Sequence, residues 1–310
     1  MLEEKAISKE EYEEAVNYKL VFTNSEGYVP KAGKTKKTTE DKNKEKEYQD
    51  FYVDYVIKSV CQDLMSKYGY TYRQAMEKIN YGGLKIYSAA NLDVQKVLNT
   101  VYSNRIAFDK EADTAEHPAV QSAATVMDYE GRIVGIVGQA GEKSGNLCLN
   151  RASESPRQPG SSIKPLSTYS LALEKDYINW SSMILNYAIY HNGKLWPQNS
   201  DGTHGSKKNV TVQYAIQKSF NTVPVRIITE MLGVNEAYNF MKKTFHLSTL
   251  DDTNDASIAP LATGSLTNGV TTVEMAAAYA VFGNNGYYYK PYCYYKVTNA
   301  TGTEVLLETK

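Results

Sequence analysis

The segment Arg157-Gln158-Pro159-Gly160-Ser161-Ser162-Ile163-Lys164-Pro165 decides how the rest of the chain is interpreted. Ser161 and Lys164 are three residues apart, so on a helix both side chains lie on one face. Pro159 and Gly160 predict a tight turn that brings Ser161 to the start of that helix. There the hydroxyl lies near free backbone N–H groups, and a desolvated amine beside it can act as its base. The segment therefore predicts a serine nucleophile built without histidine.

A simpler interpretation is that Ser161 only caps a helix over residues 163–173 and that Lys164 is solvated. This is the only Ser-x-x-Lys in the chain. Because serine and lysine are both common, the motif alone does not distinguish a nucleophile from a helix cap. The rest of the chain is needed to choose between them.

Composition limits the possible functions. The 310 residues have room for one large domain or two moderate ones, and the formal net charge of −1 predicts no nucleic-acid partner. Three widely spaced cysteines form neither a disulfide framework nor a zinc cluster. The four histidines share no close spacing, so we expect no metal and no cofactor: His117, His191, His204 and His246. The 26 tyrosines are typical of a groove for polar extended ligands, or of a core rim.

The first hundred residues predict helices around a polar linker. A capping box at Ser8 begins one helix, and residues 31–46 read as a solvated linker. A helix over residues 51–69 and a strand over 84–87 follow. Asn91 begins another helix, whose expected buried side is Leu92, Val94, Val97, Leu98 and Val101.

The remaining residues predict a hairpin, a helical block and a return to strand. The hairpin covers residues 123–137, a polar loop covers 138–150, and helices occupy most of 163–282. A tyrosine-rich strand over 287–297 and a strand over 305–307 follow. This order predicts an α/β (α+β) domain, with an antiparallel sheet and a helical block that carries the polar motifs.

A second motif, Ser219-Phe220-Asn221, follows the first in the chain. Penicillin-binding proteins and class A β-lactamases share a Ser-x-x-Lys, a second Ser-x-Asn-type motif and a Lys-Thr-Gly strand. From about residue 50 to residue 310 the chain resembles the transpeptidase region of a class A (bifunctional) penicillin-binding protein. The stretches that carry the resemblance are Gly82–Tyr87 with Leu92, Asp93 and Gln95, Asn150–Ala152, Arg157–Pro165, Ser219–Thr222, Gly264–Ser265, Gly269–Thr271, Met275–Tyr279, and Asn285–Gly286 with Lys290–Pro291.

Two features depart from that family. No Lys-Thr-Gly follows Asn221: Ala300-Thr301-Gly302 lacks the lysine, and Lys143-Ser144-Gly145 precedes Ser161, which is the wrong order. The family's upstream glycosyltransferase domain is also missing. We therefore expect a fragment whose third-motif strand lies beyond Lys310, so that the fold is incomplete at its C-terminus. The expected division is a helical tail and polar linker over 1–47, a linker region over 48–117, and a truncated transpeptidase domain over 118–310.

The resemblance implies a serine-type D-Ala-D-Ala transpeptidase or carboxypeptidase that crosslinks peptidoglycan. Its substrates would be stem peptides ending in D-Ala-D-Ala, and β-lactams would be covalent inhibitors. Ser161 would be the nucleophile, Lys164 its base, Ser219 a proton relay, and Asn221 a partner of Lys164 or of the substrate amide.

The resemblance also implies a location and a parent protein. The domain would work at the extracytoplasmic face of the bacterial cytoplasmic membrane, on an anchor outside this chain, since no run of about 18 apolar residues occurs here. The parent would also be a glycosyltransferase. The fragment alone would be impaired, because the third-motif strand supplies an oxyanion donor in the family.

Two other functions stay open. One is a serine β-lactamase or β-lactam sensor of related fold, and the other is a non-catalytic scaffold domain of the cell wall. At the level of single residues, Ser219 can be a helix-end hydroxyl and Asn221 a cap for the next helix.

Overall fold

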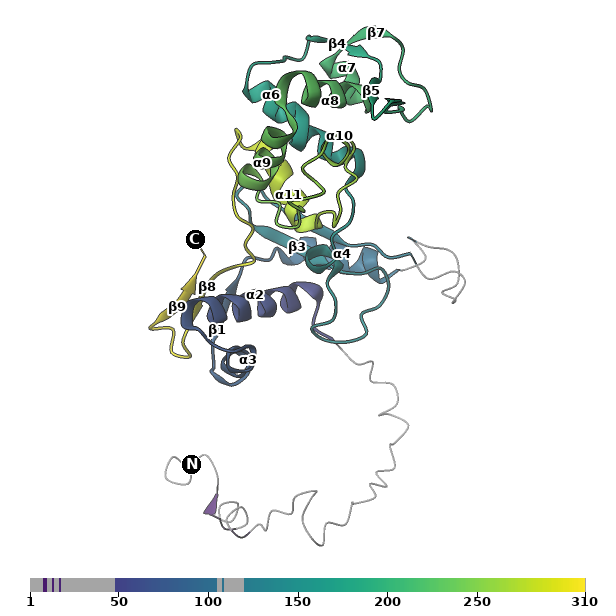
Figure 1. Cartoon of the computed structure of the whole chain (residues 1–310). Helices are drawn as coiled ribbons and strands as arrows, with labels where there is room; N and C mark the ends of the chain where they lie inside the picture. Colours follow the sequence, from purple (N-terminus) through teal and green to yellow (C-terminus); the bar gives the residue numbers. More distant parts are fainter. Residues whose placement is uncertain are drawn as a thin grey trace, which may run out of the picture. The chain divides into compact units, whose positions relative to one another are not determined.

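The structure is a computed structural model that describes residues 48–104, 108 and 120–309, together with Ser8, Lys9, Glu13 and Asn17. The chain divides into two units, Met1–Glu47 and Tyr48–Lys310. Lys9, Glu13 and Asn17 are helical. The rest of the expected N-terminal helix and the polar linker lie outside the described residues. The proposed domain boundaries stay a prediction, and the fold below is that of the second unit (Figure 1).

The unit is built mostly from short elements, which come in runs of strands and runs of helices. In chain order they are α2 (Phe51–Tyr68), α3 (Tyr72–Tyr81), β1 (Lys85–Ser88), α4 (Leu92–Ser103), β2 (Ala124–Met127), β3 (Ile133–Val137), α5 (Arg151–Glu154), η2 (Gly160–Ile163), η3 (Pro165–Tyr169), α6 (Ser170–Glu174), β4 (Met183–Asn186), β5 (Ile189–His191), β6 (Lys194–Trp196), β7 (Lys208–Thr211), α7 (Val212–Gln217), α8 (Thr222–Ile227), η4 (Ile228–Leu232), α9 (Val234–Thr244), α10 (Ile258–Thr263), α11 (Thr272–Ala280), η5 (Val281–Gly283), β8 (Tyr294–Thr298) and β9 (Val305–Glu308).

Helix α2 is the longest element, and its ends follow from the sequence. The Asp50 carboxylate accepts from the Val53 N–H at 2.8 Å, and Gly69 ends the helix with a left-handed φ of 69°. The buried side of α2 packs into what we call the sheet core, which also contains residues of β3, β8 and β9. This confirms the helix expected over residues 51–69.

The two ends of the unit meet in one antiparallel sheet of order β1-β8-β9. Lys85 pairs with Thr298, and Lys296 pairs with Glu308. Strands β8 and β9, yellow in Figure 1, therefore lie beside β1 and α2 although about 200 residues of chain separate β1 from β8. Strand β8 begins at Tyr294, later than the strand expected from residue 287.

Helix α4 covers the hairpin of β2 and β3, and its buried side differs from the expected one. Leu92 is 79% exposed and Val97 61%, whereas Gln95 is buried. The Gln95 amide donates to the Ile136 carbonyl at 3.0 Å and accepts from the Ile136 N–H at 2.9 Å. These two bonds satisfy backbone groups of buried β3 and turn the helix so that Gln95 faces inward.

Gly135 of β3 explains how α4 comes so near. A Cβ built on Gly135 would lie 2.8 Å from a methyl group of Leu98 and 3.0 Å from one of Val94. Val94 and Leu98 are thus half-buried against the strand, as expected, while Leu92, Val97 and Val101 are exposed, so that part of the prediction is wrong.

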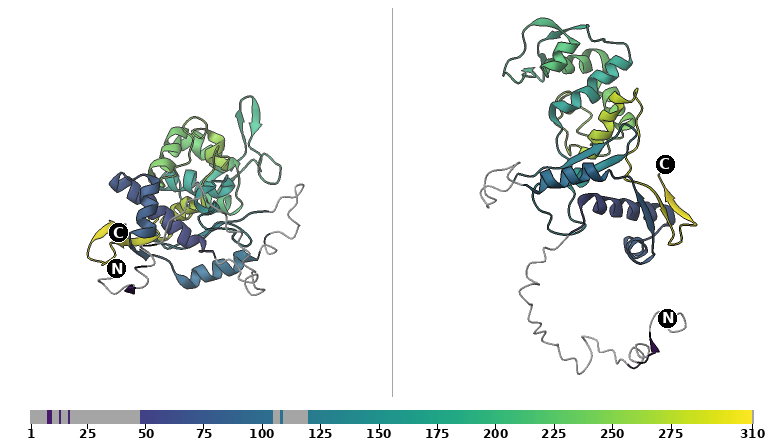
Figure 2. Two further views of the ribbon diagram at one scale, coloured as in Figure 1. Left: turned by 90° about the horizontal axis from the view of Figure 1, so that it is seen from below. Right: turned by 180° about the vertical axis from the view of Figure 1, so that it is seen from behind.

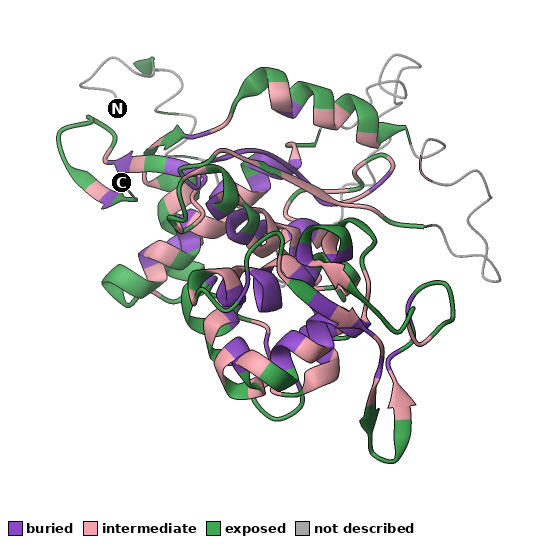
Figure 3. Ribbon diagram, turned by 90° about the horizontal axis from the view of Figure 1, so that it is seen from above, coloured by how far each residue is buried: buried purple, intermediate pink, exposed green. Residues whose placement is uncertain are grey.

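The helices from η2 to α11 surround a second cluster, which we call the helical core. In Figure 1 they lie above the sheet core, with β4, β7 and α7 at the far end, and Figure 2 shows the same arrangement from two other sides. Figure 3 shows buried positions, in purple, concentrated where these helices face one another. Fully buried members include Ile163, Leu166, Ile227, Ile228, Met241 and Leu261. No helix among the described residues is long and apolar enough to cross a membrane.

Two glycines hold the segment 157–165 against α10 and the chain that follows it. The Gly160 N–H donates to the Gly264 carbonyl at 3.3 Å, and Arg157 and Val270 exchange backbone hydrogen bonds of 2.9 and 2.8 Å. A Cβ on Gly264 would lie 2.0 Å from the Gly160 carbonyl oxygen, and one on Gly269 would lie 2.1 Å from the Arg157 carbonyl carbon. Only glycine permits this approach.

We expect Gly264→Ala to destabilise the protein by about 3 kcal/mol, because it combines a clash with backbone and a strained φ of +78°. Gly286→Ala is the matched control: its φ is +87° but its Cβ would meet nothing within 4 Å. That control should cost only about 1 kcal/mol from strain. Denaturant unfolding measures both, and equal losses would contradict the close-approach argument.

Candidate active site

Ser161 and Lys164 lie on a helical turn that is less regular than expected. Ser161 is exposed in η2, a 3-10 turn. A π turn, η3, follows before the α-helix α6 begins. In place of one regular helix over residues 163–173, the structure thus has three short pieces. Ile163 and Leu166 are fully buried in the helical core, and they fix the turn that places Lys164 inside.

The structure brings three of the four predicted site residues into direct contact. Lys164 is 2% exposed, and its Nζ donates to the Asn221 Oδ1 at 2.6 Å and to the Ser219 carbonyl at 2.8 Å. A third contact runs from Nζ to the Ser219 Oγ at 3.3 Å. An ammonium has three donors, and here each has an acceptor. The exposed Ser161 lies on the same turn, and its hydroxyl makes no hydrogen bond among the residues that the structure describes.

The turn after α7 aims both oxygens of Ser219 at Lys164. The Ser219 N–H donates to the Ile216 carbonyl at 3.0 Å, and the Phe220 N–H donates to the Ala215 carbonyl at 3.1 Å. Ser219 has a φ of 53°, a left-handed conformation that costs a non-glycine residue free energy. The packing of Phe220 against the helical core supports this conformation.

Asn221 occupies the N-cap position of α8, but its side chain does not cap the helix. Its Nδ2 donates to the Gln198 carbonyl at 2.8 Å. In a flipped amide, the NH₂ group would face the Lys164 ammonium, which is also a donor, and the oxygen would face the Gln198 carbonyl, which is also an acceptor. Neither hydrogen bond could then form, so Oδ1 is the atom that faces Lys164. The interpretation of Asn221 as a simple cap is therefore wrong.

Burial decides the protonation of Lys164. Desolvation lowers the pKa of its amine from the ordinary value of 10.5 to about 8. All three acceptors are uncharged, so no carboxylate among them opposes this shift. The neutral amine, which is the form able to accept a proton, is thus accessible near neutral pH.

The other motif-like stretches lie elsewhere. Lys143 is 2.6 Å from the buried Asp54 carboxylate at the start of α2, where it ties the 138–150 loop to the helix. Residues 300–303 form the turn between β8 and β9, with the Asn299 carboxamide accepting from the backbone. Neither stretch contributes to the Lys164 cluster, in agreement with the sequence-based interpretation.

Two residues next to the site were not singled out from the sequence. The Tyr279 hydroxyl donates to the Ser162 carbonyl at 2.6 Å, and Asn199 accepts from the Asn221 N–H at 2.8 Å. Tyr279 belongs to Met275–Tyr279, one of the stretches that carry the family resemblance, so the sequence did contain a signal that could have marked it. Asn199 lies in a polar loop with no periodicity, and no pattern marks it.

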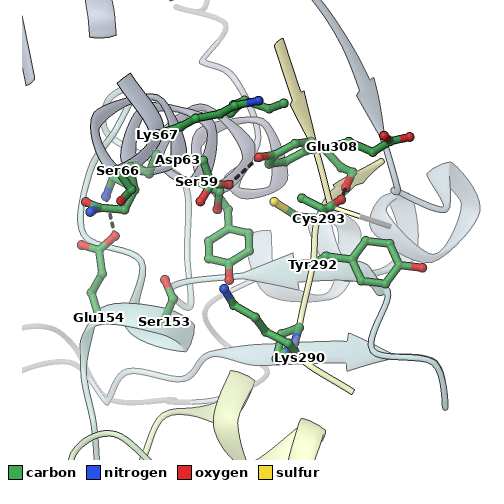
Figure 4. Close-up of a pocket in the computed structure, with 17 residues that line it drawn as sticks. Ser59, Asp63, Ser66, Lys67, Ser153, Glu154, Lys290, Tyr292, Cys293 and Glu308 are labelled. Carbon is green, nitrogen blue, oxygen red and sulfur yellow. Dashed lines mark hydrogen bonds and ion pairs between the residues drawn. The ribbon is translucent and has the colours of Figure 1, made fainter. Parts of the chain in front are cut away.

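A separate cavity of about 1010 Å³ lies between α2, α5 and the segment 290–309. Figure 4 shows Asp63, Ser66 and Lys67 of α2 on one side, with Ser153, Glu154 and Lys290 on the other. Lys58 and Glu154 form an ion pair of 2.5 Å at this cavity. None of the four predicted site residues lines it. In the part of the chain that the structure describes, no group of three His, Cys, Asp or Glu side chains could hold a metal ion.

The geometry agrees with comparisons against known proteins. Residues 122–308 match the family described as the penicillin-binding protein transpeptidase domain. The chain therefore belongs to the penicillin-binding transpeptidase family, and its mixed helical and antiparallel fold is that of these domains.

Particular relatives make the family membership more specific. The chain is 36% identical to penicillin-binding protein 1A of Clostridium acetobutylicum over 82% of its own length and 34% identical to penicillin-binding protein 1A of Clostridium tetani over 93%. It spans 32% and 38% of those proteins. The crystal structure of penicillin-binding protein 1A from Haemophilus influenzae aligns with all of this chain and 54% of that one, at 22% identity and a TM-score of 0.64, which supports the fold.

The depressed pKa of Lys164 predicts a pH-dependent stability. Below about pH 8 the amine is protonated in both folded and unfolded chains, so the cost of burying its charge is fully present. Between pH 8 and the ordinary pKa of 10.5, the unfolded chain binds more protons, so the free energy of unfolding rises with pH. Relative to Lys164→Met, which cannot titrate, wild type should gain roughly 3 kcal/mol over this range.

Urea unfolding of both proteins at matched pH values measures this difference, and tyrosine titration cancels in the comparison. Parallel stability curves for the two proteins would show that Lys164 has an ordinary pKa.

Proposed function

We propose that this chain is the catalytic part of a peptidoglycan D,D-transpeptidase that works through a serine acyl-enzyme. The observation that carries the proposal is the desolvated Lys164 amine, held by Ser219 and Asn221 on the same turn as an exposed Ser161. Membership of the transpeptidase family supplies the reaction class.

In the proposed mechanism, the Ser161 Oγ attacks the carbonyl carbon of the penultimate D-Ala in a stem peptide. The neutral Lys164 amine takes the hydroxyl proton, and its pKa near 8 keeps that form available. The tetrahedral intermediate expels the terminal D-Ala, whose nitrogen receives a proton through Ser219, 3.3 Å from the Lys164 Nζ. An amine of a second stem peptide then attacks the ester and restores the Ser161 hydroxyl. Water in its place gives carboxypeptidase action.

Charge on the tetrahedral oxygen needs backbone donors. The Ser161 N–H would be one, and the family pattern assigns another to the strand of a Lys-Thr-Gly motif, which does not follow Asn221 in this sequence. Losing one such donor costs about 3 kcal/mol of barrier. Among the described residues β2 pairs only with β3. Because this chain spans 32% and 38% of its penicillin-binding protein 1A relatives, we propose that the activity belongs to a longer polypeptide that contains it.

β-Lactams would acylate Ser161 as substrate mimics. Structures of fold relatives include PonA1 of Mycobacterium tuberculosis with penicillin V, at 18% identity.

We also propose that the full-length protein works outside the cytoplasmic membrane on an anchor beyond this chain, and that it carries a glycosyltransferase. The penicillin-binding protein 1A relatives, of which this chain spans about a third, support that view.

A β-lactamase or β-lactam sensor is disfavoured, because relatives at 36%, 34% and 30% identity are named penicillin-binding proteins. A non-catalytic scaffold is disfavoured by the strained Ser219 and the buried amine, which a binding surface does not require. Fast hydrolysis of a bound β-lactam would support the first alternative, and failure to acylate would support the second.

Labelling with a fluorescent penicillin tests the nucleophile. In the full-length protein, Ser161→Ala should lose labelling completely, because the proposed acyl-enzyme forms on the Ser161 hydroxyl. Ser162→Ala is the matched control and should keep it, since the Ser162 hydroxyl donates to the Pro159 carbonyl at 2.7 Å. Undiminished labelling of the Ser161 variant would exclude this residue as the nucleophile.

The pH dependence of acylation tests the base. Because the neutral amine is required, the acylation rate should rise with pH and level off above about pH 8. Lys164→Ala should lower the rate by 10²–10⁴-fold and abolish this rise. Stopped-flow acylation at constant ionic strength measures both, and an unchanged pH profile in the variant would assign the base elsewhere.

A further inference from the structure

Asn199 is a buried asparagine outside all the motifs, in the loop between β6 and β7. It is 5% exposed, and every polar atom of its side chain is used. Its Oδ1 accepts from the Asn221 N–H at 2.8 Å and from the Thr222 N–H at 3.4 Å. Its Nδ2 donates to the Asn186 Oδ1 at 3.1 Å. A single side chain from a distant loop thus binds the first N–H groups of α8.

Asn221 is the N-cap residue of α8 and Thr222 is its first residue, so these two N–H groups belong to the backbone where the helix begins. Asn221 stands at that position and belongs to the residue types that cap most strongly. It does not cap, since its Oδ1 accepts from Lys164 and its Nδ2 donates to Gln198. Asn199 binds the Asn221 main chain and so holds this residue where its side chain reaches both Lys164 and Gln198.

A second layer fixes the orientation of Asn199. The Asn186 Oδ1 accepts from the Asn199 Nδ2 and also from the Thr222 Oγ1 at 2.6 Å. Asn186, at the end of β4, is 3% exposed, and Thr222 is fully buried. With the Asn186 oxygen facing it, the Asn199 amide must present its NH₂ group there and its oxygen to α8.

We propose that Asn199 is a positioning residue, which holds the backbone of Asn221 and Thr222 from the loop 197–207 and thereby keeps the Asn221 carboxamide on Lys164. The inference rests on the proposed function for its catalytic meaning, because it acts through two residues of that site. It does not touch the reacting atoms.

Removal of the Asn199 acceptor should release Asn221. Without this bond the Asn221 main chain can shift and its Oδ1 can turn to the Val223 N–H, the usual target of an N-cap side chain. Lys164 then loses one of three acceptors of its protonated form. The groups that contact the Lys164 amine are the uncharged Ser219 carbonyl, Ser219 hydroxyl and Asn221 amide, so no charge replaces the lost contact. The pKa of Lys164 should therefore fall further in Asn199→Ala.

The first test uses this chain and needs no activity. The protein is made with ¹³C-labelled lysine, and the Lys164 Cε signal is assigned by its absence in Lys164→Arg. A pH titration should show a lower pKa in Asn199→Ala than in wild type. Asn91→Ala is the control: Asn91 also accepts from two N–H groups at a helix start, at 3.0 and 3.2 Å, but on α4. Its Lys164 titration should match wild type.

The second test measures acylation by penicillin in the full-length protein. Asn199→Ala should slow it about tenfold, and Asn91→Ala should not. Because Asn199 acts through Asn221, the double variant Asn199→Ala/Asn221→Ala should be no slower than Asn221→Ala alone. Additive losses would show a general structural role and overturn the proposal.

The two tests separate this proposal from the proposed function. An unchanged Lys164 pKa in a folded Asn199→Ala protein overturns the positioning role, whatever the activity. A lowered pKa supports it even where Ser161 is not acylated, and in that case it is the proposed function that fails.

Discussion

The structure depends on the burial of one amine without a counter-charge. Taking an ammonium group out of water is costly, and in most proteins a nearby carboxylate offsets the cost and keeps the group protonated. Lys164 instead has three neutral oxygen partners. They hold its position and still leave the pKa depressed to about 8. A carboxylate in the same place would have fixed the proton and removed the base.

This arrangement requires segments that are distant in sequence to approach closely. Buried Ile163 and Leu166 anchor the Lys164 turn in the helical core. Gly264 and Gly269 let the chain after α10 contact the backbone of residues 157–160. The left-handed Ser219 turns its carbonyl and hydroxyl inward. Each contact is weak alone, and the packed core makes them act together, because a dense interior permits few other arrangements.

Sequence reasoning predicted what short-range patterns encode. It placed α2, α4 and the β2–β3 hairpin, and it joined Lys164 to Ser219 and Asn221. It failed where tertiary contacts override periodicity. The apolar stripe of α4 pointed to Leu92 and Val97, but the backbone of β3 binds Gln95 and turns the helix. The turn of η3 had no local signal, and Asn199 is one polar residue in a polar loop, whose role appears only when α8 lies next to it.

Asn199 and Ser219 point to one constraint on the site. The polar side chain of a catalytic residue must not be engaged in hydrogen bonds to nearby backbone groups, although such local bonds form most easily. Asn221 stands where its side chain would cap α8, so Asn199 holds its main chain and the Gln198 carbonyl holds its Nδ2 in another orientation. Ser219 would relax to a right-handed turn, so packing around Phe220 opposes it. The free energy that keeps these groups in place therefore comes from residues that never contact a substrate, and changes in those residues can alter the site while the motifs stay intact.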